Sequence, residues 1–149
     1  MPAPEISLLT QNRLLATVHV DELRRFADVL TLRDFDIGEI IHESHQRIST
    51  VVFPIDAVMS VIAETTNGEQ VEAGLIGNDG VVGIAPFLGA ETSMLGTLCQ
   101  IPGTALVAEV GVVRVLRAHH RRVRAQHRRT TAPWRGRQTP VASPGRGPG

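Results

Sequence analysis

The residues whose types best suit metal chemistry gather between positions 39 and 45 of this 149-residue chain. His42 and His45 lie close to Glu39 and Glu43, and imidazole with carboxylate is a common set of metal ligands. However, two residues three positions apart point to opposite faces of a β-strand. The usual third histidine is missing nearby, because His19 belongs to the N-terminal region and the others follow residue 118. Surface histidines beside a loop are the simpler interpretation, and a metal site is the alternative.

The sequence gives little support for nucleophilic, redox or nucleotide-cofactor chemistry. Cys99 is the single cysteine, which excludes an intramolecular disulfide and any multi-cysteine metal or iron–sulfur site. Its apolar neighbours predict a small core residue. No nucleophile is paired with a plausible base, and glycines at every third position from Gly74 to Gly83 do not have the dinucleotide-binding spacing. We expect no enzymatic activity and no cofactor.

Composition sets the class of protein. The chain has room for one domain with a real core, and it is 42% hydrophobic but only 3% aromatic. Val, Leu, Ile and Ala must therefore build that core. The first residues lack the basic and apolar regions of a signal peptide, and no run approaches the roughly 20 apolar residues of a membrane span. We expect a cytoplasmic protein without a membrane partner.

The formal net charge of zero hides a division of the chain. Residues 1–118 carry seven arginines against fifteen acidic residues, a net charge of −8. Residues 119–149 carry eight arginines and no acid, a net charge of +8, and the chain has no lysine. This second part has too few large apolar residues to offset its ordering entropy, which predicts a disordered basic tail. Sequence-independent binding to nucleic acid phosphates is an alternative for it.

Residues 1–10 are expected to form a leader. Hydrophobic spacing predicts helices over 8–16, which begins inside that leader, and over 21–29. From Leu30 the apolar period changes to two, and turn signals separate about eight short strands. Outside the central hairpin these strands cover 30–37, 39–42, 49–53 (ended by Pro54), 93–101 and 104–110. Pro102-Gly103 predicts a turn between the last two strands. Many short strands with helices only at the ends are typical of a sandwich or jelly roll.

Asn67-Gly68 predicts a tight hairpin in the middle of the chain, because both central residues of a type I′ turn need positive φ. A two-residue loop fixes the register. The expected facing pairs are Thr66 with Glu69, Ile62 with Ala73, and Ser60 with Leu75. A turn at Gly77–Gly80 and a short helical turn within 81–88 follow.

The order of four motifs resembles the sensor domain of Crp/Fnr-type bacterial transcription regulators. The motifs are GEIIHE at 38–43, VVFPIDAVMSV at 51–61, the Asn-Gly hairpin, and GLIGNDGVVGIAPFLG at 74–89. The resemblance covers residues 11–113. It implies a mainly β, double-stranded β-helix or jelly roll of the cyclic-nucleotide-binding type with short N-terminal helices. It also implies an unidentified small-molecule effector, a long dimerisation helix after the roll, and a C-terminal helix-turn-helix that reads DNA.

The resemblance also implies a ligand pocket, with departures that affect its chemistry. The pocket residues it implies are Gly74, Gly83, Ile84, Ala85, Ser93 and Met94. Family members that bind cyclic nucleotides carry a Glu after the glycine that Gly83 matches, and an Arg about ten residues later that pairs with the phosphate. Ile84 and Met94 stand there in this chain, and no basic residue occurs between Arg47 and Arg114. A buried phosphate without its cation loses several kcal/mol, so we predict no useful cyclic AMP binding. The pocket is then filled by Ile84, Met94 and their neighbours, or takes a less anionic ligand.

Two further departures concern the turns and the end of the chain. The family commonly has Gly where His45 and Ala57 stand, and positive φ there would add strain of about 1 kcal/mol. Residues 114–149 contain no recognisable helix-turn-helix, only a helix remnant and an Arg/Pro/Gly-rich tail.

G- and C-rich codons read in a wrong frame give such a tail, so our hypothesis is that the reading frame slips between Val110 and His119. A genuine truncated paralogue with a basic tail is the alternative. In either case, we expect DNA to be a partner only if the missing C-terminal domain is restored. The homodimer that is usual in the family is not expected for this chain. The remaining alternative is a cupin-like β-roll that binds a small molecule or a metal.

Overall fold

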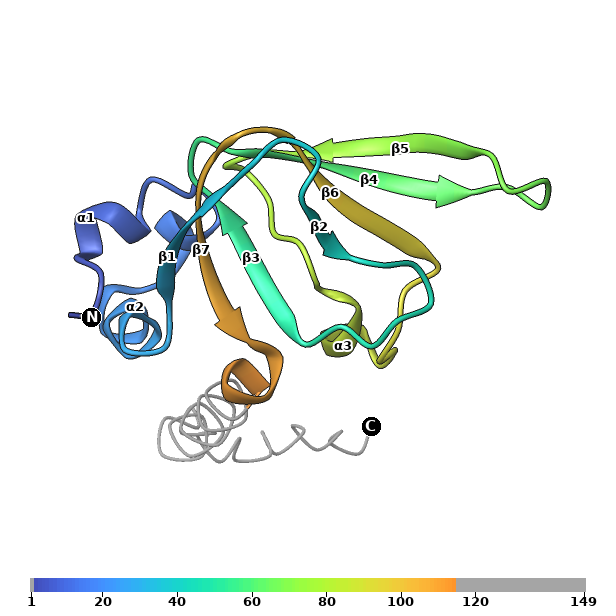
Figure 1. Cartoon of the computed structure of the whole chain (residues 1–149). Coiled ribbons are helices and arrows are strands. Elements are labelled where there is room, and N and C mark those ends of the chain that lie inside the picture. The colour runs from blue at the N-terminus through green and yellow to red at the C-terminus, as the bar shows by residue number, and fades with distance from the viewer. Residues whose placement is uncertain (1, 115–149) are drawn as a thin grey trace, which may run out of the picture.

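Two antiparallel sheets face each other in the computed structural model, which describes residues 2–114 (Figure 1). One sheet has the order β1-β7-β3, formed by Thr31–Phe35, Gly103–Glu109 and Thr50–Pro54. The other has the order β2-β6-β4-β5, formed by Ile40–His42, Leu95–Ile101, Val58–Glu64 and Gln70–Ile76. The described residues thus contain seven strands, and the predicted mainly β roll is confirmed. The predicted tail lies outside the described residues.

The helices that lie between or before the strands are short, and residues 110–114, which follow β7, are helical as well. The short helices are α1 (Ile6–Leu9), a 3-10 turn (Leu15–Thr17), α2 (Val20–Ala27) and α3 (Ala85–Leu88). The single helix expected over 8–16 is wrong, because the backbone is not helical at Asn12. The side-chain oxygen of Asn12 accepts hydrogen bonds from the N–H groups of Leu14 and Leu15, both at 3.1 Å. A short amide side chain that bonds nearby N–H groups competes with helix formation in this way.

The core has two parts. The larger cluster joins α1, α2 and the 3-10 turn to the β1-β7-β3 sheet, and it includes Leu9, Leu23, Phe53 and Leu106. Leu9, which the sequence analysis placed in the leader, is fully buried. The smaller cluster lies between the two sheets. Its buried members are Phe35, Val52, Ala57, Met59, Val82, Cys99 and Ala105. Cys99 is therefore a core residue, as predicted.

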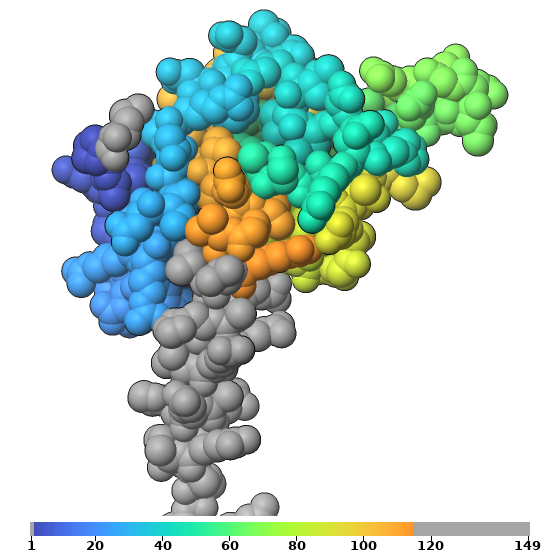
Figure 2. Space-filling view, turned by 60° about the horizontal axis from the view of Figure 1, so that its bottom comes forward, coloured from blue at the N-terminus to red at the C-terminus, as the bar shows by residue number. Residues whose placement is uncertain are grey.

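The β4–β5 hairpin projects beyond the body of the domain (Figure 2). Its turn differs from the expected one. The Gly68 N–H donates to the Thr65 carbonyl (2.9 Å), and Gly68 has φ +80° whereas Asn67 does not have positive φ. The loop is therefore longer than the predicted type I′ turn, and Glu64 pairs with Gln70.

The longer loop shifts the register of the outer half of the hairpin. Ile62 pairs with Glu72 rather than with Ala73, so that expected pair is wrong. An irregularity between Val61 and Ile62 then restores the register. Ser60 pairs with Leu75 as predicted. A β-bulge of this kind accommodates one extra residue on one strand.

The chain passes from one sheet to the other between β6 and β7 without a turn at Pro102-Gly103, so the turn predicted there is wrong. Asp56 holds this crossing, because its Oδ1 accepts hydrogen bonds from the N–H and the hydroxyl of Thr104, the latter at 2.8 Å. These bonds hold the pKa of Asp56 below its usual range. A Cβ on Gly103 would lie 2.7 Å from the Ala57 nitrogen, so the crossing needs glycine.

His45 adopts the left-handed backbone conformation with φ +64°, as expected for a position that usually holds glycine. Ala57 does not have positive φ, so the expected strain at that residue is wrong. We predict that His45→Gly raises the free energy of unfolding by about 1 kcal/mol, because it relieves the left-handed strain. Urea unfolding followed by circular dichroism measures the change.

Ala57→Gly is the matched control for this prediction. Ala57 is 1% exposed, so its replacement removes a buried methyl group and adds backbone entropy to the unfolded chain, which costs about 1 kcal/mol or more. The two glycine substitutions should therefore change stability in opposite directions. Equal losses in both variants would contradict the strain at His45.

Candidate functional site

The segment between β5 and β6 forms the candidate site. It begins with the predicted turn, in which the Gly80 N–H donates to the Gly77 carbonyl (3.1 Å). Val82 then makes an isolated antiparallel bridge to Val52, with N–H to carbonyl distances of 3.0 and 2.8 Å. This bridge fixes the chain to β3 immediately before Gly83 and α3.

Gly83 is held in a space that only glycine fits. Its φ is +87°. A Cβ there would overlap the Thr50 carbonyl oxygen, and it would lie 3.0 Å from His42 Cε1 and 3.4 Å from Ile48 Cγ2. The glycine thus lets the start of the segment lie directly against β3 and the His42 ring.

His42 is 8% exposed, so the expectation of a surface histidine is wrong for this residue. Its Nε2 lies 3.0 Å from the Thr50 carbonyl oxygen and 3.2 Å from the Thr50 hydroxyl, which connects β2 to β3 of the other sheet. Burial lowers the pKa of His42, and the bond to the Thr50 carbonyl opposes this shift in part. The neutral imidazole therefore acts as a hydrogen-bonded tie between the sheets.

We predict that acid destabilises the domain through His42. Because its folded pKa lies below the ordinary 6.5, the unfolded chain binds more protons as the pH falls through that value. Stability is then lost by up to about 1.4 kcal/mol per pH unit until the folded pKa is reached. Urea unfolding at pH 7.5, 6.5 and 5.5 measures this slope.

The variant His42→Gln should lose most of that slope, whereas His45→Gln, which changes an exposed side chain, should keep it. The contribution of Asp56 to stability changes in a separate, more acidic pH range. Its depressed pKa adds stability that is lost only below its ordinary pKa of 3.8. A parent slope that persists in His42→Gln would contradict the assignment to His42.

The structure brings most of the predicted pocket residues onto this one segment. Gly83 precedes α3, Ile84 is its N-cap residue, and Ala85 is its first residue, packed against the larger core cluster. Ser93 and Met94 are the last two residues of the segment, directly before β6. Gly74 lies in β5 opposite Val61, and a Cβ there would meet no heavy atom within 4 Å.

Ile84 and Met94 do not fill the interior. They are 48% and 75% exposed, so the expectation that they pack the pocket is wrong. Each of these two residues follows a residue whose backbone is held by contacts with another part of the chain. Ile84 follows the constrained Gly83, and Met94 follows Ser93, whose carbonyl accepts a hydrogen bond from the His45 N–H (2.7 Å). Two apolar side chains therefore face solvent at the positions where the resemblance expects an acid and a base.

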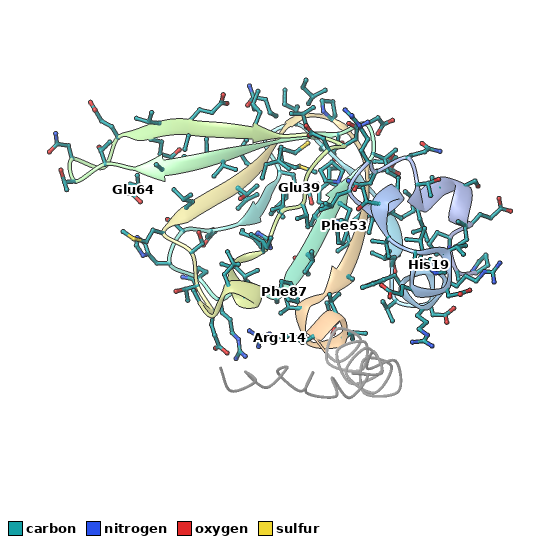
Figure 3. The ribbon with its side chains drawn as sticks, turned by 180° about the vertical axis from the view of Figure 1, so that it is seen from behind. His19, Glu39, Phe53, Glu64, Phe87 and Arg114 are labelled. Atoms are coloured by element: carbon teal, nitrogen blue, oxygen red, sulfur yellow. The ribbon has the colours of Figure 1, made fainter. Side chains whose placement is uncertain are left out.

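Two arginines reach this segment from distant parts of the chain. Arg47 Nη2 lies 3.7 Å from Glu91 Oε2, and Arg114 Nη1 lies 3.9 Å from Glu91 Oε1. Arg114 Nη2 also donates to the carbonyl of Pro86 in α3 (2.9 Å). Figure 3 shows Arg114 close to Phe87, which is the next residue of α3. The sequence analysis missed this cluster, because no spacing signal connects positions 47, 91 and 114.

A cavity of about 350 Å³ adjoins this cluster, between α3 and the helical residues 110–114. A second hollow, of about 270 Å³, lies at the other sheet and is lined by Ile40, Ile62, Leu98 and Glu43 among others. Within residues 2–114, no group of three His, Cys, Asp or Glu side chains is placed to hold a metal ion. In that same range no helix is long and apolar enough to cross a membrane.

No family model matches the sequence, and no curated protein matches it. Solved structures do match its fold. The sensor domain of the transcriptional regulator DNR from Pseudomonas aeruginosa is 11% identical with a TM-score of 0.61, and the match covers 89% of this chain and 95% of that one. The N-terminal domain of a transcriptional regulator from Streptomyces coelicolor A3(2) has the same identity and TM-score, and 87% and 99% of the two chains are covered.

Cyclic-nucleotide-binding proteins match as well. A regulatory subunit of a cAMP-independent protein kinase A from Trypanosoma brucei, a mutant bound to cAMP, is 16% identical with a TM-score of 0.64. That match covers 86% of this chain, which spans 46% of the trypanosomal protein. Residues 2–114 therefore have the cyclic-nucleotide-binding-like fold, which they share with sensor domains of transcriptional regulators.

Proposed function

We propose that this chain is the effector-sensing domain of a bacterial Crp/Fnr-type transcription regulator, that it acts in the cytoplasm as a sensor rather than as an enzyme, and that its effector is not cyclic AMP. The observation that supports this most strongly is the two-sheet roll, in which the α3 segment is held against β3 at Gly83. The match to two regulator sensor domains over almost their whole length supports the same assignment.

The exclusion of cyclic AMP is supported by the chemistry of the α3 segment. Ile84 offers no acceptor for a ribose hydroxyl, and Met94 offers no charge to a cyclic phosphate. A phosphate bound there would lack the charge-assisted hydrogen bonds that a cationic side chain supplies. Calorimetric titration of the chain with cyclic AMP should show no binding at micromolar concentrations. Micromolar affinity would overturn this part of the proposal.

We further propose that the reading frame changes between Val110 and His119, and that the dimer helix and helix-turn-helix are encoded in another frame. β7 ends at Glu109, so such a change leaves all seven strands encoded. The composition of residues 119–149, with eight arginines and no acid, also supports it.

Resequencing of the gene across these codons, followed by translation of all three frames, tests this step. We expect one frame to continue into an amphipathic helix of about twenty residues and a helix-turn-helix. The protein made in that frame should then protect a specific operator in a footprint, whereas the present chain should not. A specific footprint by the present chain would contradict the proposal, and so would the absence of such a frame.

A further inference from the structure

The cavity between α3 and the helical residues 110–114 has an apolar floor and charged walls. Ile48, Pro86 and Val110 form the floor and are buried. Arg47 and Arg114 line its walls, together with Glu91 and Glu109. At about 350 Å³ the cavity has the size of a small-molecule site.

The two guanidinium groups converge on Glu91 without hydrogen bonding it. Their distances of 3.7 and 3.9 Å from its carboxylate oxygens exceed the 2.7–3.2 Å that such bonds take, roughly. A guanidinium carries five N–H donors. Arg114 uses one of them on the Pro86 carbonyl. Most of the donors that line this cavity are therefore available to an anion.

The Glu91 carboxylate lies where such an anion would bind, but it interacts only weakly with the two arginines. Its side chain is 59% exposed, so it is free to turn toward solvent at little cost. A carboxylate that entered the cavity would form the short, two-pronged bonds that Arg favours, and its carbon chain would cover the apolar floor. Because Glu91 and Glu109 balance the two arginines, the cavity suits a monoanion better than a multiply charged one.

We propose that this cavity binds a small organic carboxylate, which Arg47 and Arg114 hold in place of Glu91. The biological meaning of this site rests on the proposed function, in which the domain senses an effector, with the change of reading frame placed after Arg114. Arg114 belongs to the helix that follows β7, and Arg47 belongs to the loop before β3. A carboxylate between them therefore connects the helix to the roll and to α3.

Titration of the ¹⁵N-labelled chain with sodium butyrate, at constant ionic strength, tests the proposal. We expect saturable shifts of the amide signals of residues 47–50, 86–91 and 110–114, and no such shifts with butylammonium chloride. Arg47→Gln should weaken binding about tenfold, because a charge-assisted hydrogen bond is lost. Glu91→Gln should tighten it about threefold, because the competing carboxylate is gone. Glu64→Gln, on the distant hairpin, is the matched control and should change nothing.

Two results would overturn the proposal. One is a linear, non-saturating response that is the same in Arg47→Gln. The other is equal affinity for inorganic phosphate and butyrate, which would make the site a bare anion site without use of its apolar floor. Neither result depends on the reading frame or on the cyclic AMP titration, so a failure here is distinguishable from a failure of the proposed function.

Discussion

Replacement of Gly83 by alanine is expected to destabilise the domain by about 3 kcal/mol or more, or to prevent folding. The new Cβ would overlap the Thr50 carbonyl oxygen and press on the His42 ring, while φ is +87°. Two costs therefore add, the strain of a left-handed backbone and the displacement of β3 or His42 from their mutual hydrogen bond.

Two other glycines separate these costs. Gly89 has φ +100° but open space around a Cβ, so Gly89→Ala should cost only the backbone strain, about 1–2 kcal/mol. Gly74 has neither problem, and Gly74→Ala should be neutral or slightly stabilising. Urea unfolding of the three variants gives the order directly. A Gly83→Ala variant as stable as Gly74→Ala would show that the segment does not lie against β3 as described.

Replacement of Asn12 by leucine is expected to cost about 3–5 kcal/mol. Asn12 is fully buried. Its side-chain nitrogen donates to the carbonyls of Pro54 (2.8 Å) and Gly80 (3.1 Å), and its oxygen accepts the N–H groups of Leu14 and Leu15. An apolar side chain of similar size keeps the volume but leaves these backbone groups without their partner.

Thermal and urea unfolding measure this loss. Gln11→Leu is the control, because Gln11 is the exposed neighbour of Asn12 and its replacement should change stability by less than about 0.5 kcal/mol. Asn12→Asp keeps the acceptor but removes the donor, so the Pro54 and Gly80 carbonyls would face a carboxylate. That variant should be no more stable than Asn12→Leu at neutral pH. A rise in its stability above the parent would contradict the assigned hydrogen bonds.

The order of the elements follows from local patterns, which is why the roll was predictable. Period-two alternation and turn residues act within a few positions, and they located β1, β3 and β6 to within about two residues. Asn67-Gly68 correctly marked the hairpin, but it did not define the loop type. The loop length depends on whether Thr65 closes the turn, and it does so with its carbonyl and its hydroxyl.

The candidate site was less predictable, because its contacts join residues far apart in sequence. His42 looked like a surface residue, since only the fold shows that Thr50 and Gly83 cover it. The same holds for Arg47 and Arg114, which no periodicity places at Glu91. The positive φ of His45 was predictable because the resemblance places a glycine at that position. The same argument failed at Ala57, which does not have positive φ.

The central place of β7 has a consequence for the order of synthesis. β7 lies between β1 and β3, and Thr31 pairs with Val107. Proteins are made from the N-terminus, so β1 and β3 leave the ribosome before the strand that joins them, and their edges remain open to other chains. Such distant pairing is slow to form. The two sheets therefore assemble only after Glu109 has been added, and the open edges favour co-translational aggregation in the interval just before that point.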